Sequence, residues 1–62
     1  MFKMEIKTGG AAFRDENGNL DPYGYEVAKL LENTAYYLRH GETGGVLIDI
    51  NGNKVGSWSY ED

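Results

Sequence analysis

The 62-residue chain has no cysteine and only one histidine, His40. It therefore has no disulfide and no thiolate metal ligand, and a lone histidine leaves little with which to build a transition-metal site. Domains this small usually rely on disulfides, a metal or a second subunit, because their core barely outweighs the ordering entropy of the chain. We expect a single domain, residues 1–62, with no metal and no cofactor, supported as a homodimer or higher homo-oligomer.

Long apolar runs are also missing. No stretch approaches the length needed to cross a bilayer, and Met1–Ile6 alternates apolar with charged residues instead of joining a basic head to an apolar segment. The sequence therefore predicts no membrane association, no signal peptide and a cytoplasmic location.

Clustered positive charge is the third absence. The chain carries ten acidic and six basic residues, for a net charge of −4, and the basic residues are scattered along it. Binding to a phosphate backbone needs several neighbouring cations, so direct nucleic-acid binding is not expected. An acidic surface suits a basic partner protein, and ordinary solubility explains it equally well.

The residues that are present predict a strand at the N-terminus. Phe2, Met4 and Ile6 alternate with charged residues, which is the period-two pattern of a half-buried strand. Two glycines then favour a turn, after which residues 11–14 are predicted as a short second strand. The following segment, 15–19, is rich in turn formers and predicts a type I′ turn at its Asn-Gly pair.

A single amphipathic helix is predicted between Asp21 and Gly41. Asp21 is a favourable N-cap, Pro22 suits the first helical position, and Gly41 suits the C′ position. At about 1.5 Å per residue this helix is roughly 28 Å long. Its expected core face consists of Tyr23, Val27, Leu30, Leu31, Thr34 and Leu38.

A hairpin is predicted around Asn51-Gly52. This loop places Trp58 opposite Gly45 and Ile48 opposite Val55, whereas a Gly52-Asn53 loop would pair Leu47 with Trp58. One face of the hairpin carries Val46, Ile48, Ile50 and Val55, expected under the helix. The other carries Leu47, Asp49, Gly56, Trp58 and Tyr60, and is expected to meet a partner because it is too apolar to face water.

These elements predict an α+β fold. Its small antiparallel sheet has three to four strands and packs on one central helix, in the order strand, short second strand, helix, strand, strand. The segments D-E-N-G-N and D-I-N-G-N repeat a turn pattern. They lack the spacing of a calcium-binding EF-hand loop, so turn chemistry is the favoured interpretation.

Tyrosines on the helix face opposite the core suggest an interface. Tyr25, Lys29, Glu32 and Tyr36 fall close together at helical spacing. Tyrosine supplies contact area at low entropy cost, so this face is interpreted as a docking surface. The alternative is that the rings only cover the stems of charged neighbours.

Two acid–base candidates also remain open. His40 is interpreted as a cation at the helix terminus, or as a general acid or base near Tyr36 and Glu42. Asp49 either pairs with Lys54 across the hairpin, or forms a carboxylate recess rimmed by aromatic rings at a dimer seam, where it would bind a ribose or base.

The segments G-A-A-F at 10–13, E-V-A-K-L-L at 26–31 and D-I-N-G-N-K-V-G at 49–56 resemble those of a group of very short phage and prophage proteins. Members of that group typically have Asn where this chain has Gly10, and Arg where it has Lys29. The first difference weakens a ligand role for position 10. Small phage proteins of this kind often counter host defence, by binding a defence protein or by sequestering or cleaving a nucleotide immune signal.

The resemblance implies a counter-defence protein of the host cytosol. It would bind, with hydrolysis left open, a cyclic nucleotide or cyclic ADP-ribose type of signal, and any hydrolase activity would be metal-independent. The alternative is a non-enzymatic module that inhibits a host protein through its acidic surface and tyrosine-bearing helix. The candidate catalytic residues are Asp49, Glu26 and His40. The candidate ligand-binding residues are Phe13, Lys29, Tyr36, Arg39, Asn51, Asn53, Trp58 and Tyr60.

Overall fold

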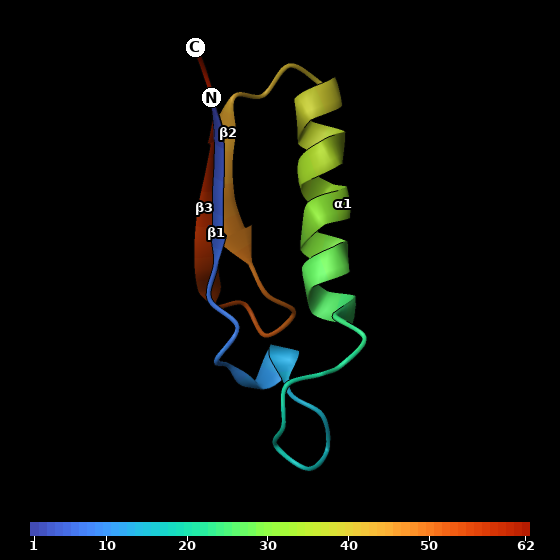
Figure 1. Ribbon diagram of the computed structural model, residues 1–62. Coiled ribbons are helices and arrows are strands. Elements are labelled where there is room, and N and C mark those ends of the chain that lie inside the picture. Colours follow the sequence, from blue (N-terminus) through green and yellow to red (C-terminus); the bar gives the residue numbers. More distant parts are fainter.

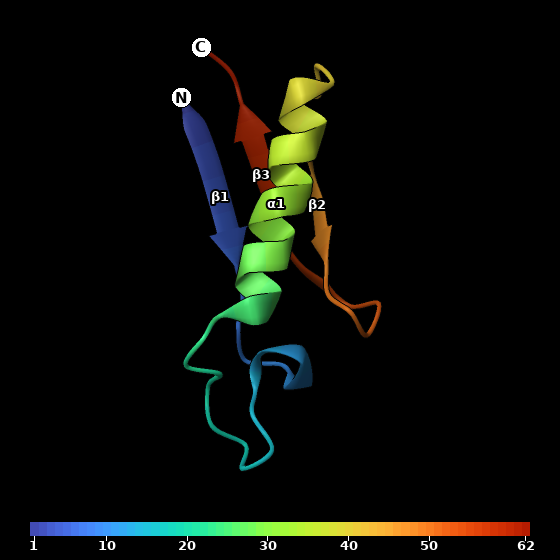
Figure 2. The same ribbon diagram turned by 90° about the vertical axis from the view of Figure 1, so that its right-hand side faces the viewer.

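The computed structural model describes residues 1–62 and contains one helix and three strands (Figure 1). The elements in chain order are β1 (Phe2–Ile6), a 3₁₀ turn (Ala11–Phe13), α1 (Tyr25–Arg39), β2 (Gly44–Ile48) and β3 (Lys54–Tyr60). The sheet is antiparallel throughout, with the strand order β1-β3-β2. Helix α1 covers one face of this sheet and crosses β3 obliquely (Figure 2). The predicted α+β fold is therefore confirmed.

The central strand β3 fixes which side chains meet the helix. Trp58 lies opposite Met4 of β1 and Gly45 of β2, as expected for the hairpin. Its ring covers Gly45 so closely that a Cβ atom there would lie 3.0 Å from the indole Nε1. Directly opposed residues share one face of a sheet, so all three positions face α1.

The expected assignment of the hairpin faces is wrong for β2 and for Trp58 of β3, which is buried beneath the helix. Leu47 is buried beneath the helix, while Val46 and Ile48 are exposed. A bulge also interrupts the pairing of the two strands. Leu47 is opposite Gly56 and Ile48 is opposite Lys54, which leaves Val55 as an extra residue on β3. The expected pairing of Ile48 with Val55 is therefore also wrong.

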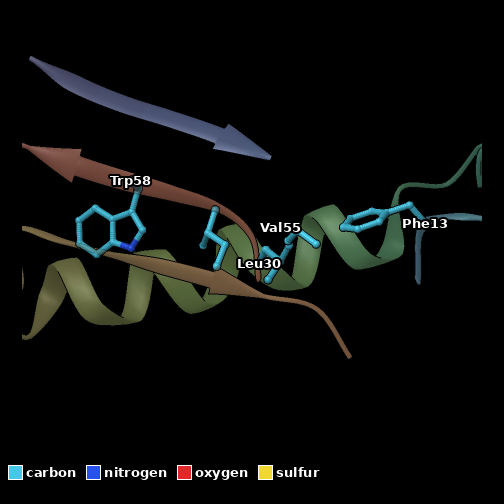
Figure 3. Packing of buried hydrophobic residues seen from close by; sticks show 5 residues of the cluster. Phe13, Leu30, Val55 and Trp58 are labelled. Carbon is cyan, nitrogen blue, oxygen red and sulfur yellow. The ribbon is translucent and has the colours of Figure 1, made fainter. Parts of the chain in front are cut away.

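The core is a short row of apolar side chains between sheet and helix (Figure 3). Its five buried members are Phe13, Leu30, Leu47, Val55 and Trp58. Phe13 comes from the segment predicted as a second strand, which instead forms a 3₁₀ turn in which the N–H of Arg14 donates to the carbonyl of Ala11 at 3.1 Å. This turn places Phe13 at one end of the row, where a strand would have alternated its side chains across two faces.

Helix α1 begins at Tyr25, later than predicted. The carboxylate of Asp21 accepts the N–H of Tyr23 at 2.9 Å, and its carbonyl accepts the N–H of Gly24 at 3.3 Å, so this segment is a turn. Gly24 has a left-handed φ of 62°, which interrupts the helical backbone before Tyr25. The resulting helix is about 22 Å long at 1.5 Å per residue.

The C-terminal end of α1 agrees with the prediction. Gly41 has a φ of 86°, and its N–H donates to the carbonyl of Leu38 at 3.1 Å. The N–H of Glu42 donates to the carbonyl of Tyr37 at 3.0 Å. These two bonds form a Schellman motif, which satisfies carbonyls left unpaired at the helix end.

The buried face of α1 differs in part from the predicted stripe. Glu26, Leu30 and Thr34, spaced four residues apart, are its buried residues, while Leu31 and Tyr23 are exposed. The hydroxyl of Thr34 donates to the carbonyl of Leu30 at 2.9 Å, which satisfies this polar group in the core. A pattern of apolar residues alone does not identify Glu26 as a buried position.

Candidate functional site

Asp49 organises the loop between β2 and β3. Its side chain is buried, and its Oδ1 accepts the N–H of Asn51 at 3.0 Å and that of Asn53 at 2.9 Å. The main chain closes the same loop, because the N–H of Gly52 donates to the carbonyl of Asp49 at 3.0 Å. The expected aromatic-rimmed recess on an outer face is therefore wrong: Trp58 lies beneath the helix, and Oδ1 holds the loop.

The loop that contains Asp15 has the same hydrogen bonds. Oδ1 of Asp15 accepts the N–H of Asn17 at 2.9 Å and that of Asn19 at 3.0 Å, and its carbonyl accepts the N–H of Gly18 at 3.0 Å. No residue other than glycine has a positive φ, so the predicted type I′ turn at Asn-Gly is wrong. Each loop instead has three residues and ends with a left-handed glycine, which is why both have the sequence D-x-N-G-N.

Glu26 connects the first turn of α1 to this hairpin loop. Its Oε2 accepts the main-chain N–H of Ile50 at 2.9 Å and lies 2.8 Å from Nζ of Lys29. A carboxylate in the first helical turn also interacts favourably with the positive end of the helix dipole. Glu26 and Asp49 therefore hold the same loop: Glu26 accepts the N–H of Ile50, and Asp49 accepts those of Asn51 and Asn53.

His40 lies at the other end of the helix. Its Nδ1 is 2.8 Å from the carbonyl oxygen of Tyr36, and the two rings have centroids 4.2 Å apart. The helical rise separates His40 from Glu26 by about 21 Å along the axis. The structure thus brings Asp49 and Glu26 to one loop and leaves His40 apart from both.

The predicted ligand-binding residues are dispersed over the molecule. Phe13 and Trp58 are in the core, where their ring faces are not available for stacking on a base. The other candidates lie on three surfaces: Asn51 and Asn53 in the hairpin loop, Lys29, Tyr36 and Arg39 on α1, and Tyr60 at the end of β3.

The outward side of α1 is where exposed aromatic rings gather. Tyr25 is 69% exposed and Tyr36 is 57% exposed, on the side of the helix turned away from the core. Tyr25 stacks on Tyr23, with ring centroids 5.6 Å apart, and Tyr36 meets Tyr37 edge to face at 5.5 Å. Tyr23 is exposed and not in the core as expected, because it precedes the turn at Gly24 and does not belong to the helix.

Comparison with known protein families, characterised proteins and solved structures finds no match to this chain. Within the chain itself, no group of three or more acidic, histidine or cysteine side chains is arranged to hold a metal ion. The single helix is too short and too polar to cross a membrane.

Proposed function

We propose that this protein is a non-enzymatic interaction module that binds another protein through the outward side of α1. We call this surface the tyrosine face and define it as Tyr25, Lys29, Glu32 and Tyr36. The proposal places recognition on a regular helix, which presents its side chains with little conformational freedom.

The observation that carries the proposal is the exposure of Tyr25 and Tyr36 at the two ends of one helix face. Each ring is already packed against a neighbouring tyrosine, so little side-chain entropy remains to be lost on binding. Tyrosine is also among the residues most enriched at the centre of protein interfaces.

The charge of the chain favours a basic partner. A net charge of −4 on 62 residues attracts a positively charged surface and steers its approach. The likeness to short phage-encoded proteins supports a host defence protein as that partner. Inhibition would follow from occupation of the partner's surface, without any chemical step on this chain.

Capture from host lysate on the immobilised protein tests this function. The double variant Tyr25→Ala/Tyr36→Ala is expected to lose the captured partner, and raised salt is expected to weaken capture by the wild type. Tyr60→Ala is the matched control, because Tyr60 is 56% exposed but lies on the sheet. Capture of the same proteins by all three chains would contradict the proposal.

A second candidate is binding of a nucleotide-derived immune signal, as the resemblance implies. The supporting observation is local: the exposed rings of Tyr36 and Tyr37 lie at the same end of α1 as Arg39, so aromatic faces and a cation lie close together. Bases stack on such rings, and guanidinium groups bind phosphates.

A panel of cyclic nucleotides and cyclic ADP-ribose compounds distinguishes the two candidates. Binding by calorimetry that is lost in Arg39→Ala and kept in Lys3→Ala would favour the nucleotide. Recovery of each compound after incubation shows whether hydrolysis accompanies binding. If every compound stays unbound and intact, this candidate is eliminated and the protein partner remains.

A further inference from the structure

Strand β2 is an open edge of the sheet. The order β1-β3-β2 leaves one side of β2 without a partner strand. The N–H of Tyr60 donates to the carbonyl of Thr43 at 2.8 Å, which sets the alternation of hydrogen bonds along this pair of strands. Beyond the bulge, the N–H of Asp49 donates to the carbonyl of Asn53 at 2.9 Å. It follows that the main-chain groups of Gly44, Val46 and Ile48 point away from β3, toward solvent.

The two open edges of the sheet differ in charge. On the surface turned away from the helix, β1 carries Lys3 and Glu5, and charged side chains of this kind prevent edge strands from pairing with other chains. The sequence of β2 is Gly-Gly-Val-Leu-Ile, without charge or proline. Val46 is 57% exposed and Ile48 is 45% exposed, so this edge is both apolar and unprotected.

We propose that β2 pairs with β2 of a second copy, antiparallel and about a two-fold axis at Val46. Val46 then lies opposite itself, and Gly44 lies opposite Ile48 of the other copy. Each opposed pair exchanges two N–H···O bonds, since these residues have their main-chain groups turned outward. The result is one continuous sheet of six strands, three from each copy.

The position of the helix leaves room for this arrangement. Because α1 crosses β3, the two helices would lie on the same face of the joined sheet, and the points at which they cross their own β3 strands would be three strand spacings, or about 14 Å, apart. Packed helices are usually about 8–10 Å apart, so the backbones do not clash. Tyr37 and Asn33 line the groove of about 140 Å³ between α1 and β2, and they are placed to fill the gap between the helices.

Three observations favour a second copy over an unrelated strand. Only five apolar residues are buried in the single chain, and neither a disulfide nor a metal cluster is present, so further apolar burial contributes strongly to stability. An uncharged strand opposes its own copy without repulsion, although the chain as a whole carries −4. The two-fold axis also places Val46 and Ile48 of both copies in one apolar stripe on the outer surface, which buries side chains left exposed in the single chain.

Sedimentation equilibrium with the full chain tests this interface. The wild type is expected to shift from 6.9 kDa toward twice that mass between about 1 µM and about 1 mM, the range in which small interfaces dissociate. Val46→Lys places like charges directly opposite each other and is expected to raise the dissociation constant by about tenfold or more. Leu31→Lys is the matched control, since Leu31 is 49% exposed on the helix, and it is expected to leave the dissociation constant unchanged.

A mixing experiment tests the axis itself. Val46→Lys and Val46→Glu are each expected to be monomeric, and an equimolar mixture is expected to form a heterodimer, because only self-opposition at residue 46 makes the two charges complementary. Hydrogen exchange adds a main-chain measurement, in which the Val46 amide becomes protected as concentration rises. A wild type that stays monomeric up to about 1 mM would overturn the proposal. Dimers that persist in Val46→Lys would overturn it as well.

Discussion

The carboxylate of Glu26 accepts the main-chain N–H of Ile50 at a distance of 2.9 Å. The first residue is in the opening turn of α1 and the second is in the loop between β2 and β3. This contact joins the helix to the hairpin at the end of the molecule where the core consists of Phe13 and Val55. A charged residue near the start of a helix therefore has a structural explanation that requires no catalytic role.

Removal of this contact is expected to destabilise the fold. Glu26→Ala leaves the N–H of Ile50 without its partner and should lower the free energy of unfolding by about 1–3 kcal/mol. Glu26→Gln keeps an acceptor oxygen and loses the ion pair with Lys29, which is partly exposed and worth about 1 kcal/mol or less. Urea denaturation measures both variants. Equal stability of the two would show that the hydrogen bond to Ile50 contributes little.

The two D-x-N-G-N loops allow an internal comparison. Asp49→Ala and Asp15→Ala remove the same two side-chain hydrogen bonds, but Asp49 is 5% exposed whereas Asp15 is only half-buried. We expect a loss of about 2–3 kcal/mol at Asp49 and about 1 kcal/mol at Asp15, because an unpaired N–H costs more where water cannot replace its partner. Thermal unfolding of the two single variants ranks them, and a larger loss at Asp15 would contradict this explanation.

Gly56 is the position least able to accept a side chain. A Cβ atom there would lie 1.8 Å from the carbonyl oxygen of Glu5, which belongs to the backbone of β1 and has little freedom to move. Gly56→Ala should therefore separate β1 from β3 and cost about 4 kcal/mol or more, enough to unfold much of the population. Gly10→Ala is the control, since nothing lies within 4 Å of the added atom. Circular dichroism of both variants should show folded structure only in the control.

The assignment of faces on β2 makes a further prediction. Leu47→Ala removes a buried side chain from beneath α1 and should cost about 2–4 kcal/mol. Ile48→Ala removes a side chain of similar size that is 45% exposed, and it should cost about 1 kcal/mol or less. The free energy of unfolding of both variants should be measured at low protein concentration, where association between copies does not contribute to stability. A reversed order would restore the face assignment expected from sequence.

The pattern of β1 allowed its strand to be predicted, because only one of its two faces is apolar. In β2 both Val46 and Leu47 are apolar, so a period of two does not choose between the faces. Which face of β2 meets the helix depends on a contact that is distant in sequence, the pairing of Met4 with Trp58. This pairing puts the largest side chain of β3 on the apolar face of β1, which is the face that the helix covers. The bulge then adds Val55 to the same core, and a bulge has no reliable signature in a single sequence.

The helix start was mispredicted because Asp21 and Pro22 suit a turn as well as a cap. The deciding residue is Gly24, whose left-handed backbone separates this turn from α1. Of the candidate site residues, Asp49 and Glu26 were identified as unusual acids, and the structure gives both a role in holding a loop. Tyr25 and Tyr36 were expected to face outward from helical periodicity alone, and their side chains are exposed.

The strand order β1-β3-β2 has a consequence for synthesis and folding. The middle strand β3 is the last of the three strands to be synthesised, so β1 and β2 have no shared partner until β3 has emerged from the ribosome. Pairing of β1 with β3 joins nearly opposite ends of the sequence, and such distant contacts slow folding because a large loop closes before they are gained. During translation we therefore expect the helix to form early and the sheet to form in a single later step, once β3 has emerged.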